Sequence, residues 1–527
     1  MLDNTTIDNF IRSCNSVINS NEEMPYKITY AKKHIFLFNS FLLENKNKYV
    51  LARLHLEIAN LTAFVGYNTI NDNEASKILT EGLEQINSIE NLGFPRKTMK
   101  LESYKIAGEI HLNLFFILKN EPHFKETIEN YDHLFKAKHY FSKLINENNA
   151  HSLPLSKEKH LDIFLKYSET VLQLSRYVEP LYFLDFIKNN AISPKYNGSY
   201  SIANFALKEA IKENTCNNTH PLLLIDILEF ANNALNSKKH IDKRNIKLLE
   251  ETIKDSDATL SQYCNDFGET IQELKHRYLC NIDKIQEYDD YEQFKLEHHL
   301  VLNEHALYCN CKYALDDNLT IKAGCEHTKI DWLKNFEFDL IDMIHTFCES
   351  RKNYYDGIKA LENYDYSSND IIQTPAVQKL RNSFKDCFSA FDKIAFDINL
   401  AMGKPVKKVF FHTFFDANKV KEIINNTPNN LYLIALFSIA KDFNDAYGKE
   451  ELHYHKKWRN EIEHNSFRLI SPNADIKKLE IEYPDTFLLP LEVFKNVALL
   501  TLYHCKSAIF SFAWAMRKLS KIHDSKT

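Results

Sequence analysis

Glycine and proline are scarce in this chain, which has 10 glycines and 13 prolines among 527 residues. Each accounts for roughly 2% of the sequence, against averages of about 7% and 5% in soluble proteins. The sequence contains no P-loop, no G-x-G-x-x-G turn and no G-x-S-x-G elbow, which argues against P-loop nucleotide hydrolysis, dehydrogenase chemistry and esterase chemistry. So few turn-forming residues favour helices joined by short loops.

The charge balance and the cysteines narrow the class of protein further. With 65 basic and 71 acidic residues the formal net charge is -6, which argues against indiscriminate coating of nucleic acid but allows a local basic cleft. The 10 cysteines are scattered over a long chain, a pattern typical of reduced thiols rather than of a disulfide framework.

The amino terminus, residues 1–6, lacks the basic and apolar regions of a signal peptide. We find no stretch of about 18 residues free of charge or strong polarity, so we expect no membrane-spanning segment. The sequence predicts a cytoplasmic protein.

Apolar residues recur at helical spacing from about residue 28 to residue 280. Small residues suited to helix crossings accompany these stripes, namely Ala59, Gly82, Ala107 and Ala137. Paired helices of this kind resemble a degenerate tetratricopeptide-type solenoid, and a plain irregular helical bundle is the alternative. We assign residues 1–280 to a regulatory or interaction region. The stripes run as follows: 51–61, 75–86, 104–118, 131–145, 161–174, 182–187 and 222–235.

The second half, residues 281–527, has a different texture. We divide it into a junction and accessory segment, 281–375, and a core bundle, 376–527. The accessory segment begins with an aromatic and histidine-rich passage and ends in a polar loop, 362–375. An amphipathic helix is predicted over 376–401, with Gly403 and Pro405 ending it. Further helices are expected after Asn430 and over 488–519, and helices of this length can close a four-helix bundle. The predicted fold class is all-α.

One run in this half, 453–467, contains an arginine, a polar residue directly after it and a histidine five positions on: Arg459, Asn460 and His464. An imidazole can move a proton near neutral pH, and a guanidinium can hold a phosphate. Together they supply the proton transfer and charge neutralisation that attack of a 2'-hydroxyl on a phosphodiester requires, without a metal. On a helix, Asn460 and His464 share a face, and Arg459 can reach the same cleft with its long side chain.

The spacing has two other interpretations. Arg459 with Glu463, and Lys457 with Glu461, can form ordinary surface pairs four residues apart. A second match to the arginine and histidine pattern, from Arg517 to His523 in the tail, is interpreted as a coincidence, because chance alone gives about one match in such a chain.

The run resembles the R-[polar]-x-x-x-H signature of the HEPN superfamily (higher eukaryotes and prokaryotes nucleotide-binding), here in the form Arg459-Asn460-Glu461-Ile462-Glu463-His464. The helix at 380–396 is similar to the earlier core helix of a HEPN branch in which a solenoid-like region precedes the bundle. The likeness covers about residues 290–527. Many members of this superfamily are metal-independent endoribonucleases of bacterial conflict systems, with all-α bundles.

The resemblance implies a role for each residue of the motif. His464 would transfer the proton at the 2'-hydroxyl or the leaving 5'-oxygen, Arg459 would stabilise the scissile phosphate, and Asn460 would orient one of them. Two motifs would meet across a symmetric homodimer, and the products would be a 2',3'-cyclic phosphate and a 5'-hydroxyl. RNA-binding candidates are Asp392 and Lys393, as partners behind the motif, and Lys456, Lys457, Lys407 and Lys408, as a source of positive potential.

A separate group of soft ligands, Cys309, Cys311, Cys325 and His327, offers side chains that zinc accepts. The spacing is unusual, because paired zinc ligands are normally two or more residues apart. We therefore predict no metal and no cofactor.

The sequence thus predicts an endoribonuclease, a toxin or antiphage effector, whose amino-terminal half senses a regulatory protein or ligand. The alternative is a non-catalytic interaction protein that uses a HEPN fold for dimerisation or nucleotide binding. A further possibility is a toxin silenced by a cognate antitoxin.

Overall fold

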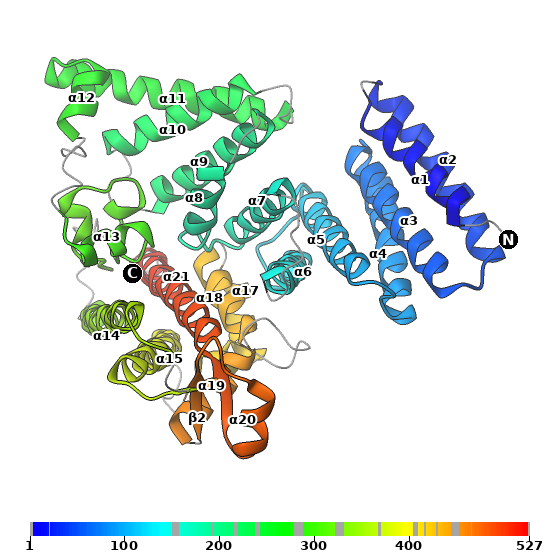
Figure 1. Ribbon diagram of the computed structural model, residues 1–527. Coiled ribbons are helices and arrows are strands. Elements are labelled where there is room, and N and C mark those ends of the chain that lie inside the picture. Colours follow the sequence, from blue (N-terminus) through cyan, green and yellow to red (C-terminus); the bar gives the residue numbers. More distant parts are fainter. Residues whose placement is uncertain are drawn as a thin grey trace. The chain divides into compact units, whose positions relative to one another are not determined.

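The computed structural model describes residues 4–20, 22–149, 157–190, 194–214, 220–237, 243–278, 288–321, 331–366, 370–403, 409–415, 418–427, 430–443, 453–464 and 466–524. The chain is mostly helical, as predicted, and divides into two compact units, residues 1–170 and 171–527 (Figure 1). The domain boundary predicted at residue 280 falls within 279–287, outside the described residues, and stays a prediction.

The first unit is built from helices that pack against their neighbours in the chain, which gives it the predicted repeat-like character (Figure 1). Ala59, Ala107 and Ala137 are fully buried. A Cβ atom on Gly82 would lie 2.6 Å from Oγ1 of Thr62, so this position needs a glycine for close helix approach. The elements are α1 (Asn4–Ile18), α2 (Met24–Glu44), α3 (Lys48–Asn68), α4 (Asp72–Leu92), α5 (Lys97–Lys119), η1 (Glu129–Tyr131), α6 (Asp132–Asn149) and α7 (Lys157–Gln173), the last of which runs past the unit boundary.

The second unit opens with a layer of helices in which α9 packs on α10 and α10 on α11. A segment with little regular structure follows, residues 288–321, which we call the accessory segment from here on. The elements are α8 (Pro180–Asn190), α9 (Pro194–Asn214), α10 (Pro221–Asn236), α11 (Lys243–Phe267), α12 (Ile271–Tyr278), α13 (Asp290–Glu297), η4 (His305–Leu307) and η5 (Lys312–Leu315).

The helical bundle lies at the carboxy-terminal end of this unit. Its long helices are α14 (Asp331–Glu362), α15 (Pro375–Ala401), α18 (Leu431–Asp442) and α21 (Leu491–Asp524). α15 packs against both α14 and α21, and α18 packs against α21. Shorter helices complete it: α16 (Phe411–Phe414), α17 (Asn418–Asn426), α19 (His453–His464) and α20 (Ile476–Glu482).

α15 illustrates how closely the sequence specifies a bundle helix. The hydroxyl of Thr374 accepts a hydrogen bond from the backbone N–H of Val377 and caps the helix, and Pro375 occupies the first turn. After the helix, Gly403 has a φ of +66°, a left-handed conformation that glycine adopts without strain. The predicted helix 376–401 is confirmed to within one residue. Pro405 lies outside the described residues.

A small sheet, which the sequence analysis missed, accompanies the bundle. Its strands are β1 (Ile371–Ile372), β2 (Phe467–Ile470) and β3 (Phe487–Pro490), in the order β1-β2-β3. β1 pairs antiparallel with β2, and β2 pairs parallel with β3. β2 begins three residues after the end of α19, so the sheet fixes where that helix ends.

α21 is the central helix of the bundle, and by length and composition its residues Leu491–Ser520 could cross a membrane. Their mean hydropathy over the most apolar window is 1.2, but 89% of that window is buried inside the protein. Burial of this kind is what the core helix of a folded bundle shows.

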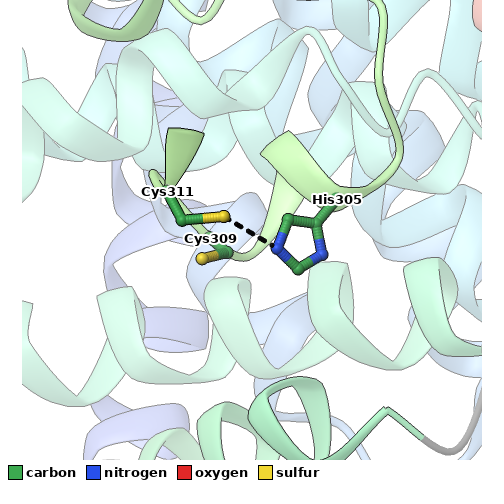
Figure 2. Close-up of side chains that lie close together, drawn as sticks. All are labelled: His305, Cys309 and Cys311. Atoms are coloured by element: carbon green, nitrogen blue, oxygen red, sulfur yellow. Dashed lines mark hydrogen bonds between the residues drawn. The ribbon is translucent and has the colours of Figure 1, made fainter. Parts of the chain in front are cut away.

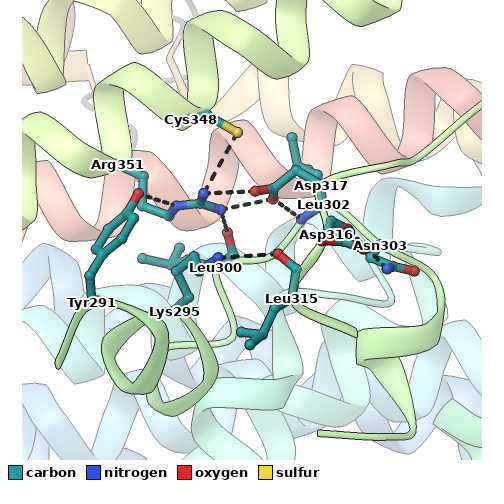
Figure 3. Close-up of polar contacts among 10 residues, drawn as sticks. All are labelled: Tyr291, Lys295, Leu300, Leu302, Asn303, Leu315, Asp316, Asp317, Cys348 and Arg351. Atoms are coloured by element: carbon teal, nitrogen blue, oxygen red, sulfur yellow. Dashed lines mark hydrogen bonds and ion pairs between the residues drawn. The ribbon is translucent and has the colours of Figure 1, made fainter. Parts of the chain in front are cut away.

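Arg351 of α14 holds the accessory segment against the bundle (Figure 3). Its guanidinium donates to both carboxylate oxygens of Asp317, at 2.8 and 2.7 Å, and to the carbonyl oxygen of Leu300 at 2.6 Å. Nε donates to the hydroxyl of Tyr291 at 3.0 Å, and Arg351 is only 2% exposed. Burial by itself would raise the pKa of Asp317, but the hydrogen bonds and charge of Arg351 hold it below its usual range.

Replacing Arg351 with methionine should lower the free energy of unfolding of this unit by about 3–5 kcal/mol, because Asp317 is left buried and unpaired. The double variant Arg351→Met, Asp317→Asn should recover part of the loss, since asparagine carries no charge and keeps an oxygen for the N–H of Leu302. Urea denaturation of the three proteins measures both effects. Equal stability of the wild type and the single variant would contradict the assignment.

The same pair predicts a pH dependence. A carboxyl group whose folded pKa is depressed contributes stability above its unfolded pKa of about 3.9 and loses it as the pH falls through the folded value. The wild type should therefore lose more stability between pH 7 and pH 4 than Arg351→Met, as measured by denaturation midpoints.

Candidate functional site

α19, which carries the predicted motif, is anchored through one face. His455 is fully buried, with Nδ1 3.3 Å from the hydroxyl of Thr501 on α21. Trp458 is buried one turn later, with its ring centroid 6.3 Å from the rings of both Phe487 and Phe494. The face that carries Trp458 therefore packs into the bundle, as the sequence analysis expected, and Asn460 is exposed.

A pocket of about 240 Å³ opens beside this helix. Arg459 and Asn460 form its polar side together with Asp392 of α15. Its remaining wall is aromatic and comes from α15, from the stretch around α16 and from the end of α18: Phe388, Phe391, Phe410, Phe411, His412 and Phe443. A guanidinium, an amide and a carboxylate thus converge on one apolar cavity, which is the usual composition of a small-ligand or active site.

Arg459 sits between two carboxylates without being locked to either. Nη1 lies 3.4 Å from Oδ2 of Asp392, and Nε lies 3.6 Å from Oε2 of Glu463. Among the described residues Nε has no hydrogen-bond partner, although it is buried. Long, half-exposed pairs of this kind contribute about 0–1 kcal/mol, so an incoming anion can compete for the guanidinium. The guanidinium also lies over the ring of Phe388, 5.6 Å from its centroid.

Asp392 links the arginine to the aromatic wall. One oxygen, Oδ1, accepts a hydrogen bond of 3.0 Å from the backbone N–H of Phe411, and the other faces Arg459. Burial raises the pKa of Asp392 above the usual carboxyl range, against the opposing effects of the Phe411 hydrogen bond and the charge of Arg459. The side chain thus fixes the position of Arg459 and of the segment that closes the pocket.

The other predicted RNA-binding residues are not brought to the pocket. Lys393, next to Asp392, points to α14 and pairs with Asp339 at 3.0 Å and Asp342 at 2.9 Å. Lys457 is exposed, with Nζ 5.4 Å from the ring centroid of Phe487.

Some of the predicted side chains cannot be placed. His464 is the last residue of α19, but its side chain, like that of Lys456, lies outside the described part of the chain. Lys407 and Lys408 also lie outside it.

The second arginine and histidine pair has a structural explanation. Arg517 is buried in α21 and donates to Oε1 of Glu304 at 2.5 Å and to the carbonyl oxygen of Thr320. Its guanidinium ties α21 to the accessory segment. The side chain of His523 is outside the described residues.

The sequence analysis missed Phe410, Phe411 and His412, which form the far wall of the pocket. The signal for them was the aromatic cluster 410–415, whose residues are too closely spaced to form one face of a helix. Spacing alone gives no way to place them opposite Arg459, because about fifty residues separate the two segments.

Two of the four soft ligands noted in the sequence lie together. Cys309 and Cys311 are buried in the accessory segment, and His305 completes a cluster whose ligand atoms all lie within 4.8 Å of one another (Figure 2). Cys325 and His327 lie outside the described residues.

Replacing Trp458 with alanine should destabilise the docking of α19 by about 3–5 kcal/mol, because it removes a buried ring from between Phe487 and Phe494. Lys457→Ala, one residue away on the exposed face, should cost no more than about 1 kcal/mol. Thermal unfolding of the two variants provides the comparison. Similar losses would show that α19 is not anchored through this face.

Comparison with known proteins identifies one part of the chain. Residues 338–518, about a third of it, match the family described as LA2681-like HEPN, and the match includes α15, the pocket residues and the whole of α19. Neither the curated proteins nor the solved structures include a match to this chain. The first unit has no family assignment, and HEPN families often act as ribonucleases. Residues 338–518 therefore form an LA2681-like HEPN domain, preceded by a helical, repeat-like amino-terminal region.

Proposed function

We propose that this protein is a metal-independent endoribonuclease whose active site is the pocket beside α19. The observation that carries the proposal is the convergence of Arg459 and Asn460 on a cavity of about 240 Å³ within the HEPN domain. His464 lies one helical turn beyond Asn460 on the same face of α19, at the position where the family signature has its histidine.

The reaction needs two contributions from this site. The imidazole of His464 would take the proton of a 2'-hydroxyl, or deliver one to the leaving 5'-oxygen, while Arg459 would neutralise the extra negative charge of the pentacoordinate phosphate. The weak pairs of Arg459 suit this role, because the phosphate would replace Asp392 as its partner. Asn460 would orient the phosphate or the imidazole.

The proposal includes a homodimer with two copies of the motif in one composite cleft. Asn460 is exposed and Arg459 is only partly buried, so both are accessible to a second copy. The substrate is RNA, because the mechanism uses a 2'-hydroxyl, and the protein would act in the cytoplasm as a toxin or antiphage effector. The amino-terminal helical region would bind the regulatory protein or ligand that controls it.

A second candidate function is supported by the same contacts. Arg459 lies within 3.6 Å of both Asp392 and Glu463, which is what a structural arginine of a non-catalytic HEPN fold would show. In that case the domain serves dimerisation or nucleotide binding. The two functions differ in whether the protein cuts RNA.

Purified wild-type protein should degrade RNA in the presence of EDTA, leaving 2',3'-cyclic phosphate ends. His464→Ala and Arg459→Ala should each lower the rate by at least about 100-fold, because each removes one of the two contributions to the transition state. Lys393→Ala, whose lysine pairs with α14 instead, is the matched control and should retain activity. Equal rates in all four proteins, or an activity that returns from EDTA only with Mg²⁺, would contradict the proposal.

The composite site makes a separate prediction about mixtures. Arg459→Ala and His464→Ala should each be inactive as homodimers, and a mixed dimer combining them regains one intact arginine and one intact histidine in the cleft. Co-expression with two affinity tags isolates the mixed species, and its rate should exceed that of either parent by about tenfold or more. A mixed dimer as inactive as its parents, or a monomeric active enzyme, would rule out the shared cleft.

A further inference from the structure

A second group of chemically competent side chains lies in the accessory segment, outside the residues that line the Arg459 pocket. His305 begins η4, Cys309 follows it four residues later, and Cys311 directly precedes η5. The two turns bring the side chains to one point: Nε2 of His305 lies 3.3 Å from Sγ of Cys311, and Sγ of Cys309 is in the same cluster (Figure 2).

The separations fit a single metal ion. Zinc binds thiolate sulfur at about 2.3 Å and imidazole nitrogen at about 2.0–2.1 Å in tetrahedral geometry, which sets the two atoms about 3.5 Å apart. The His305 and Cys311 atoms are 3.3 Å apart. Shifts of a few tenths of an ångström would therefore bring this pair to the spacing that zinc requires.

The imidazole is held as metal ligands usually are. Nδ1 of His305 lies 3.1 Å from the hydroxyl of Tyr308, which fixes the ring and leaves Nε2 facing the cysteines. Burial lowers the pKa of His305, so the ring is neutral and carries a lone pair for a metal at neutral pH. The ring of His220, at the start of α10, lies 5.3 Å from the ring of His305.

The surroundings favour a structural ion over a reactive one. Cys311 is fully buried and Cys309 is 5% exposed, and both pack with Leu222 of α10 and Ala314. A buried thiol alone behaves as a small apolar residue. Two thiols that converge with an oriented imidazole in the same core have the donor set of a zinc site.

We propose that His305, Cys309 and Cys311 bind one zinc ion that staples the accessory segment beside the start of α10. The fourth position is open to a solvent molecule or to His220. This ion has no part in RNA cleavage, so the inference does not depend on the proposed ribonuclease function. It joins two turns that have few backbone hydrogen bonds of their own.

The test is the metal content of the full chain, purified under reducing conditions and measured by elemental mass spectrometry. Wild-type protein should carry about one zinc per chain. Cys311→Ser and His305→Ala should each lower this at least about tenfold, because a site with two protein ligands binds zinc far more weakly. The matched control is Cys264→Ser, which removes a half-buried thiol outside the cluster and should leave the zinc content unchanged. Loss of zinc from the control to the same extent would overturn the assignment.

A second measurement covers variants that fail to fold. Wild-type protein stripped with a strong chelator should take up one Co²⁺ and develop the charge-transfer absorption of cobalt bound to thiolates, which added zinc should abolish. Stripped protein should also melt at a lower temperature and recover with zinc. Wild-type chains that carry no zinc and give no thiolate absorption with Co²⁺ would refute the site. RNA cleavage by zinc-restored protein and its absence in His464→Ala would be read separately, as evidence on catalysis alone.

Discussion

The buried polar side chains of α21 constrain where the rest of the second unit can lie. Lys506 and Arg517 are almost fully buried, and a charge in a protein interior costs several kcal/mol unless it is paired. Lys506 donates to the carbonyl oxygen of His299 at 2.6 Å, and Arg517 pairs with Glu304. Burial lowers the pKa of Lys506 to about 7. The accessory segment has little regular structure, and these contacts, together with Arg351, hold it in place.

The same constraint extends the unit beyond the HEPN family match. Arg176, just before α8, donates to Nδ1 of His504 on α21 at 2.9 Å and pairs with Glu179 and Asp442. Burial lowers the pKa of His504, which keeps the ring neutral and able to accept this bond. Residues 171–337 therefore pack with the family domain, 338–518, as one compact unit. A shortened chain that begins at residue 338 would leave these groups of α21 without partners.

The parts that the sequence predicts are those decided by local chemistry. The amphipathic period of α15, its threonine cap and the left-handed Gly403 are all readable within thirty residues, so its bounds are nearly right. β1 has two residues and exists only through its pairing with β2, so no local pattern announces it. Long-range placement is also what hides the pocket wall at Phe411 and the inclusion of His305 with the cysteines. The motif on α19 is visible in the sequence, whereas the cavity beside Arg459 depends on three other segments.

Asp392 holds two parts of the pocket at once, the N–H of Phe411 and the guanidinium of Arg459. An anion that draws Arg459 away leaves a buried carboxylate with one remaining hydrogen bond, and its pKa, already raised by burial, must rise further. Anion binding and proton uptake by Asp392 are then thermodynamically linked, and each favours the other. The occupancy of this pocket would thus respond to acidity through a residue that never touches the ligand.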